Sequence, residues 1–78
     1  MHVVIAKVDE VLFEGEAYSL TVPATAGEMT VLGHHEPLIT TLKVGEARVR
    51  LSAGETAQIF PITGGVLEVR SDGATVIL

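Results

Sequence analysis

The sequence has 78 residues and a formal net charge of −5, with ten acidic and five basic side chains and no cysteine. The length allows one domain, and the lack of cysteine excludes disulfides, thiolate metal sites and a cysteine nucleophile. Hydrophobic residues make up 47% of the chain and aromatic residues only 4%, so a core would be aliphatic. The acidic balance argues against nucleic acid or an anionic lipid surface as a partner.

The first residues predict an extended segment without targeting features. The segments 3–6 and 65–67 are apolar on both faces, which indicates that something covers them, either a second sheet or a partner surface. The chain lacks the basic start and small-residue cleavage site of a signal peptide. No apolar run approaches the roughly 20 residues that span a bilayer. We expect a cytoplasmic location.

Acidic residues gather around the first predicted turn, at Asp9, Glu10, Glu14 and Glu16. Paired carboxylates can carry out acid–base chemistry, but only where a cleft separates their pKa values. The surrounding pattern indicates an exposed hairpin. We therefore expect a solvated face and no catalytic residue.

Two adjacent histidines, His34 and His35, precede Glu36 and raise the question of a metal site. Neighbouring side chains on an extended chain point to opposite sides, and a zinc site needs three or four ligands. His2 is the only other histidine. We expect no metal and no other cofactor.

Alternation with a period of two is clearest in the second half of the chain. The segment 45–51 sets Ala47, Val49 and Leu51 opposite charged residues, and the segment 74–78 repeats the alternation. This pattern is typical of strands in a sheet with one buried face.

Glycines at short intervals predict the turns between the strands. They fall at Glu14-Gly15, Ala26-Gly27, Gly33, Val44-Gly45, Ala53-Gly54, Gly64-Gly65 and Asp72-Gly73. The last pair is the clearest hairpin signal, because Asp-Gly suits a type I′ turn. With no window of helical periodicity, we expect an all-β fold, a small antiparallel β-sandwich of about ten short strands that occupies residues 1–78 as one domain.

One long motif combines a Val-Pro turn, a Gly-Glu pair, two apolar residues, a His, a Pro, a Thr and a Leu-Lys-x-Gly turn. Its positions are Val22, Pro23, Gly27, Glu28, Val31, Leu32, His35, Pro37, Leu38, Thr40, Leu42, Lys43 and Gly45. The motif resembles the signature of the epsilon subunit of F-type ATP synthase, in its N-terminal β-sandwich domain.

Two further segments support the resemblance, which covers essentially the whole chain. The segment 63–69 is similar to the Gly-Gly-x-Leu-Glu-Val strand of the family, and Phe13-Glu14-Gly15 matches its opening. The chain departs from the family pattern at Ala24 and Gly33, which concerns local turn geometry. Family members usually continue into a helical hairpin that binds nucleotide or restrains rotation in some of them. The chain does not contain that hairpin, so neither role is carried over.

The resemblance implies a non-catalytic subunit and not an enzyme. Family members lie in the central stalk, the rotor of F1Fo ATP synthase, where they grip the gamma subunit and meet the c-ring, so that ion translocation is coupled to ATP synthesis. The implied location is peripheral, on the cytoplasmic side of the plasma (inner) membrane as part of F1, without direct lipid insertion.

The family positions transfer to two groups of residues in this chain. The expected c-ring contact is Gly27, Glu28 and Met29. The expected gamma contact is His35, Leu38 and Thr40. Glu28 would meet a basic side chain on the ring. Without the resemblance, we would interpret Glu28 as a solvent-exposed carboxylate in a turn. We would interpret His35 as a histidine whose ring is hydrogen-bonded within a turn.

Two other functions remain open at this point. A swinging-arm carrier domain of the biotinyl or lipoyl type is also a small β-sandwich, and Lys43 lies in a predicted turn, although it lacks the neighbours characteristic of such carriers. A stand-alone adaptor with the same fold would bind partners unrelated to ATP synthase.

Overall fold

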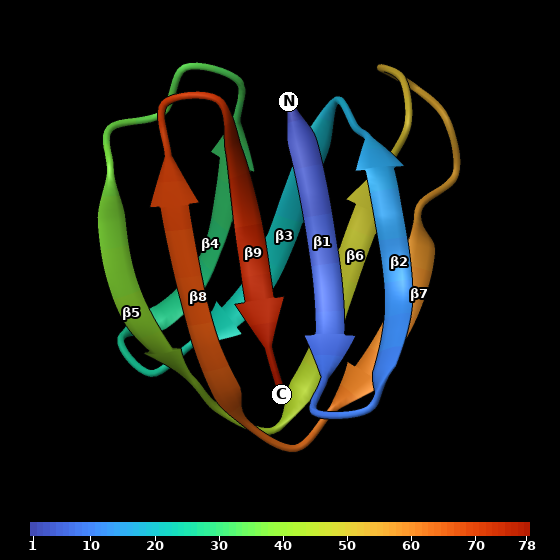
Figure 1. Cartoon of the computed structure of the whole chain (residues 1–78). Helices are drawn as coiled ribbons and strands as arrows, with labels where there is room; N and C mark the ends of the chain where they lie inside the picture. Colours follow the sequence, from blue (N-terminus) through green and yellow to red (C-terminus); the bar gives the residue numbers. More distant parts are fainter.

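The computed structural model describes all 78 residues, and its regular elements are strands alone (Figure 1). The strands are β1 (His2–Lys7), β2 (Glu10–Glu16), β3 (Ser19–Ala24), β4 (Gly27–Leu32), β5 (Leu38–Leu42), β6 (Gly45–Arg50), β7 (Gln58–Ile62), β8 (Gly65–Arg70) and β9 (Gly73–Ile77). The all-β expectation is confirmed, with nine strands where about ten were expected.

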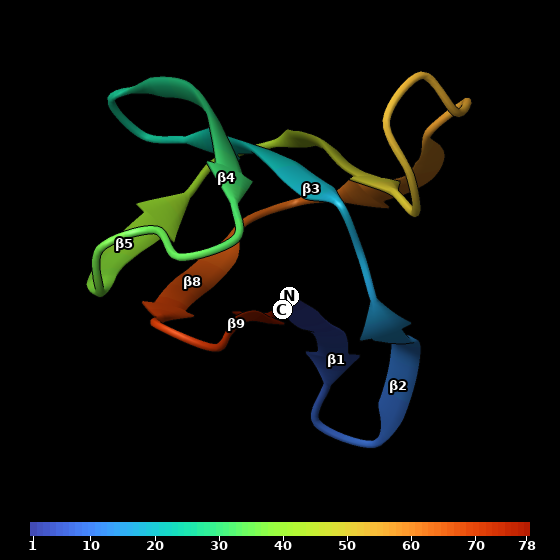
Figure 2. The ribbon, with the colours of Figure 1, turned by 90° about the horizontal axis from the view of Figure 1, so that it is seen from above.

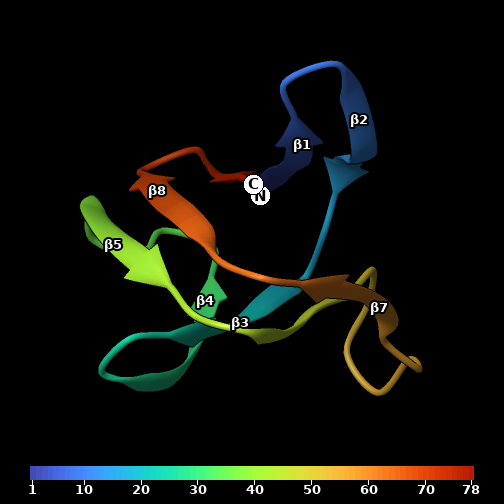
Figure 3. The ribbon, with the colours of Figure 1, turned by 90° about the horizontal axis from the view of Figure 1, so that it is seen from below.

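The strands form one curled sheet in the order β2-β1-β9-β8-β5-β3-β6-β7, with β4 paired to the other side of β3. Strands β5 and β3 meet only at Ala24 and Leu42, so the sheet folds over there into two facing layers. Strands β2, β1, β9, β8 and β5 form one layer, and β4, β3, β6 and β7 form the other (Figures 2 and 3). All pairs are antiparallel except β1 with β9, where the first and last strands run side by side in the same direction.

The core lies between the two layers and is aliphatic, as the composition predicts. Fifteen buried hydrophobic residues form one cluster, and its largest fully buried side chains are Ile5, Leu20, Leu67, Val3, Val22, Val31, Val49, Val69 and Val76. They alternate along their strands with side chains on the outer faces, because successive side chains of a strand point to opposite sides. Close packing of this kind makes a body that deforms little.

The predicted alternation is confirmed where the strands are regular. Ala47 and Val49 of β6 are buried, as are Ala74 and Val76 of β9. Leu51 differs, since it follows the end of β6 and is exposed.

The prediction for the last hairpin is wrong in its turn type. Gly73 pairs with Arg70, so the two loop residues are Ser71 and Asp72, and neither has a positive φ. Gly73 begins β9 beside β1, where an added Cβ would collide with the carbonyl oxygen of His2. The glycine therefore permits the close approach of the two parallel strands, and it does not make a type I′ turn.

Glu14-Gly15 is also not a turn. Gly15 lies within β2 opposite Val3 of β1, and the chain reverses at Val8–Asp9 instead. Glycine at a position without a positive φ gave a false turn signal here.

Candidate functional site

The expected c-ring contact lies at one end of the sandwich, directly after the β3–β4 turn. The turn consists of Thr25 and Ala26, since Ala24 pairs with Gly27. Gly27 has φ of 135°, a conformation that side chains other than glycine rarely adopt. An added Cβ there would meet nothing within 4 Å, so the requirement for glycine is conformational and not steric.

Glu28 follows on β4 and points to the outer face, where it has a partner within the chain. Its Oε2 lies 3.5 Å from Nη1 of Arg48, whose Nη2 lies 3.7 Å from Oε1 of Glu46. All three side chains are substantially exposed, so each of these ion pairs contributes at most about 1 kcal/mol to stability. An external basic group could therefore replace Arg48 at little cost in stability.

Met29 points to the other side of β4. It is half-buried and packs against the core. Of the three expected ring-contact residues, only Glu28 presents its polar group fully to the outside.

His35 lies in the loop between β4 and β5, at the opposite end of the sandwich from Glu28 (Figure 1). It follows His34, which has a left-handed φ of 65°. The His35 Nδ1 lies 2.8 Å from the carbonyl oxygen of Glu36, and because a carbonyl can only accept, Nδ1 carries the proton and donates. The other ring nitrogen has no partner within the chain, so it is free to face an external group.

Leu38 and Thr40 lie on β5, and their register places both on the inner side of the strand. Leu38 pairs with Val69 and Thr40 with Leu67, two buried residues of β8. Leu38 packs against the core, and Thr40 is half-buried. The outward residues of β5 are Ile39 and Thr41, and the Ile39 side chain is 74% exposed. The sequence analysis missed Ile39, although strict alternation along β5 would have indicated it.

The two groups of expected contact residues are therefore separated in space. Glu28 lies near the β3–β4 turn, whereas His35 lies past the other end of β4 (Figure 1). A partner that touches both must extend along the sandwich, or two partners must touch one each.

Exposed apolar residues gather at the end of the sandwich that carries Glu28. Val8 in the β1–β2 turn is fully exposed, and Val44 in the β5–β6 turn is 73% exposed. Above them, the outer face of β2, β1, β9 and β8 carries a row of directly paired residues. This apolar row consists of Val11, Ala6, Ile77 and Val66. Three of these four are exposed, and together with Val8 and Val44 they form an apolar surface of the kind that interfaces use.

The acidic residues of the first hairpin lie on strands and a turn, as expected. Glu14 and Glu16 lie on the outer face of β2 beside His2, with Nε2–Oε2 and Nδ1–Oε2 distances of 3.2 and 3.5 Å. No group of three or more His, Cys, Asp or Glu side chains is placed to hold a metal ion. The structure has no helix whose length and apolarity would let it cross a membrane.

These features define a small β-sandwich with exposed apolar and charged surfaces at its Glu28 end. Residues 1–78 match the family model described as ATP synthase, Delta/Epsilon chain, beta-sandwich domain, and the chain belongs to this family. It is 42% identical over 76 residues to the ATP synthase epsilon chain of Dichelobacter nodosus, covering 97% of this chain and 52% of that protein. It is 35% identical over 77 residues to the epsilon chain of Delftia acidovorans, covering 99% and 55%.

A solved structure supports the same relationship. A chain in the cryo-EM structure of the Euglena gracilis mitochondrial ATP synthase, OSCP/F1/c-ring, superposes with a TM-score of 0.86 at 25% identity. The match covers 96% of this chain and 48% of that chain. The sequence thus spans about half the length of the curated relatives it matches.

Proposed function

We propose that the chain is a non-catalytic rotor subunit of F1Fo ATP synthase, which docks on the gamma subunit and the c-ring and couples ion translocation to ATP synthesis. Its place would be peripheral, on the cytoplasmic side of the membrane. The family match over residues 1–78 supports this role, because the relatives carry the name ATP synthase epsilon chain.

The observation that carries the proposal is the composition of the Glu28 end. It presents an outward carboxylate together with the exposed side chains of Val8 and Val44. Apolar contact supplies affinity at an interface, and a charged residue fixes orientation. A ring of identical subunits with basic polar loops is the kind of surface that this combination fits.

The gamma subunit would contact His35 and the outer face of β5. His35 offers a free ring nitrogen, and Ile39 offers an exposed apolar side chain on the neighbouring strand. Leu38 and Thr40 would support this surface from the inner side of β5 and not by direct contact.

Single introduced cysteines test both assignments, because the native chain has none. In the assembled enzyme, Glu28→Cys should cross-link to the c-ring and His35→Cys to gamma. Leu32→Cys, at the far end of β4 from Glu28, is the control for the ring and should give no ring product. Cross-linking of the ring from position 32 and not from position 28 would overturn the proposed orientation.

A further inference from the structure

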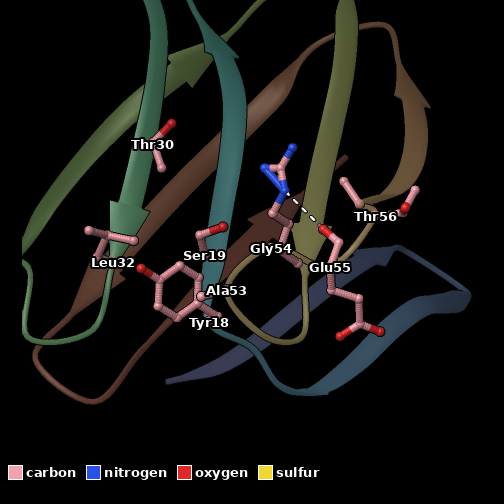
Figure 4. A pocket seen from close by; sticks show the side chains of 10 residues that line it. Tyr18, Ser19, Thr30, Leu32, Ala53, Gly54, Glu55 and Thr56 are labelled. Carbon is pink, nitrogen blue, oxygen red and sulfur yellow. Dashed lines mark hydrogen bonds between the residues drawn. The ribbon is translucent and has the colours of Figure 1, made fainter.

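The chain has a single surface pocket, of about 630 Å³, on the outer side of the layer formed by β4, β3 and β6 (Figure 4). Ser19, Thr30 and Leu32 line it from the strands, with Tyr18 before β3 and residues 53–57 from the β6–β7 loop on the opposite wall. The backbone N–H of Tyr18 donates to the carbonyl oxygen of Arg50 at 2.8 Å, which ties the β2–β3 connection to the end of β6.

Arg50 lines this pocket without a carboxylate partner. Arg48 and Arg70 each form ion pairs with two acidic side chains. Arg50 instead donates only from Nε, to the carbonyl oxygen of Glu55 at 3.2 Å, the dashed line in Figure 4. Its two terminal nitrogens have no partner in a chain with twice as many acidic as basic residues. A guanidinium whose Nη1 and Nη2 are both free can bind a carboxylate through two parallel hydrogen bonds.

Ser19 supplies a second polar group that has no hydrogen-bond partner within the chain. The residue is only 4% exposed, and its hydroxyl takes part in none of the side-chain hydrogen bonds of the chain. No fully occluded polar side-chain atom lacks a partner, so the Ser19 hydroxyl must reach the open space of the pocket. The hydroxyl is therefore available to hydrogen-bond a group that enters the pocket.

The carboxylate of Glu55 also lines the pocket. Its Oε2 accepts a hydrogen bond from the Ser52 hydroxyl at 2.7 Å, and it forms no ion pair with Arg50. The terminal nitrogens of Arg50 are therefore open to a carboxylate from outside the chain.

The pocket is open, and two of the residues that line it, Tyr18 and Leu32, are about half-exposed. Tyrosine and arginine are among the residues enriched at the energetic centres of protein interfaces. A small molecule would remain largely in water in so open a pocket, whereas a protein segment could cover the rim as well.

We infer that this pocket is a docking site for a protein segment that presents an acidic side chain beside an apolar one. The carboxylate binds the terminal nitrogens of Arg50 and the Ser19 hydroxyl, and the apolar side chain packs on Tyr18 and Leu32. The inference goes beyond the proposed rotor role, because the pocket lies at the opposite end of β4 from Glu28. It thus leaves the expected c-ring contact free.

The test is an NMR titration of the ¹⁵N-labelled chain with the blocked dipeptide acetyl-Leu-Glu-amide. We expect shifts at Tyr18, Ser19 and the Arg50 side chain, with a dissociation constant on the order of 1–10 mM for so small a probe. The matched dipeptide acetyl-Leu-Gln-amide has the same shape without the charge, and it should bind about tenfold more weakly.

Two variants and one competitor complete the test. Arg50→Gln should lose about tenfold in affinity for the Glu dipeptide, whereas Arg48→Gln, on the same strand and outer face, should keep it. Equal binding of the Glu and Gln dipeptides, no response up to roughly 20 mM, or loss in Arg48→Gln instead would overturn the inference. Tighter binding of inorganic phosphate at Arg50 than of the Glu dipeptide would also overturn it, since the pocket would then be a small-anion site. Because the titration involves no other ATP synthase subunit, its failure would leave the rotor proposal untouched.

Discussion

Glu28 on β4 and Arg48 on β6 form an ion pair of 3.5 Å across the outer face of β3, although twenty residues of sequence separate them. Both side chains are exposed, so the pair is weak and can exchange partners. The residue that the family resemblance expects at the c-ring thus has a weak partner in its own chain, which a basic group on the ring would displace.

Charge reversal at Glu28 should lower the rate of ATP synthesis without lowering the stability of the fold. In Glu28→Lys we expect the free energy of unfolding to change by about 1 kcal/mol or less, because the lost ion pair is exposed. We expect proton-driven ATP synthesis in membrane vesicles to fall clearly, because a lysine would repel a basic ring loop. Asp72→Lys is the matched control, since it also removes an exposed pair with an arginine but lies in the β8–β9 turn, at the opposite end of the sandwich (Figure 1). Unchanged synthesis in Glu28→Lys would remove this residue from the interface.

The fully exposed valine in the first turn should matter for binding and not for stability. Val8→Ser should leave the unfolding transition within about 0.5 kcal/mol of the native chain, because the side chain loses no packing. It should weaken association with the c-ring severalfold, as measured by retention of the chain on purified rings. Ile59→Ser, an exposed position on β7 of the other layer, should have no effect on retention. Equal loss in both variants would indicate nonspecific apolar contact.

The close approach of β1 and β9 predicts a large effect at Gly73. Gly73→Ala should destabilise the chain by about 1–3 kcal/mol, because the new methyl group collides with the His2 carbonyl oxygen and forces the strands apart. Gly33→Ala is the control, since a Cβ there meets nothing within 4 Å and its φ is not positive. Urea denaturation measures both. Equal stability of the two variants would contradict the parallel β1–β9 pair.

Shortening a side chain at the centre of the core should lower the free energy of unfolding more than Gly73→Ala does. Leu67 is fully buried between the layers, and Leu67→Ala should cost about 2–5 kcal/mol. The neighbouring Val66 faces outward in the apolar row, so Val66→Ala should cost well under about 1 kcal/mol. A domain of this size has a small stability margin, and Leu67→Ala should be largely unfolded at 37 °C.

The sequence predicted the features that depend on short-range periodicity. Alternation identified the buried sides of β6 and β9, and the aliphatic composition predicted the core. The family motif, spread over residues 22–45, identified the family that the comparison confirms. These features are local or involve many matched positions, so the folded arrangement was not needed to see them.

Features that arise from contact between distant segments were missed. Gly15 and Gly73 were interpreted as turn residues, yet the reason for Gly73 is a carbonyl group on a strand 71 residues earlier in the chain. The Glu28–Arg48 pair depends on β4 and β6 both flanking β3. The pocket around Arg50 likewise combines three strands and a loop, and no short motif encodes it.

Direct measurement of complex formation with gamma tests the central claim most simply. The 78-residue chain and the gamma subunit encoded in the same genome are mixed and analysed by size-exclusion chromatography with light scattering. We predict a one-to-one complex whose formation is weakened by Ile39→Asp on the outer face of β5. Separate elution of the two proteins at micromolar concentrations would contradict the rotor role and favour an adaptor with other partners.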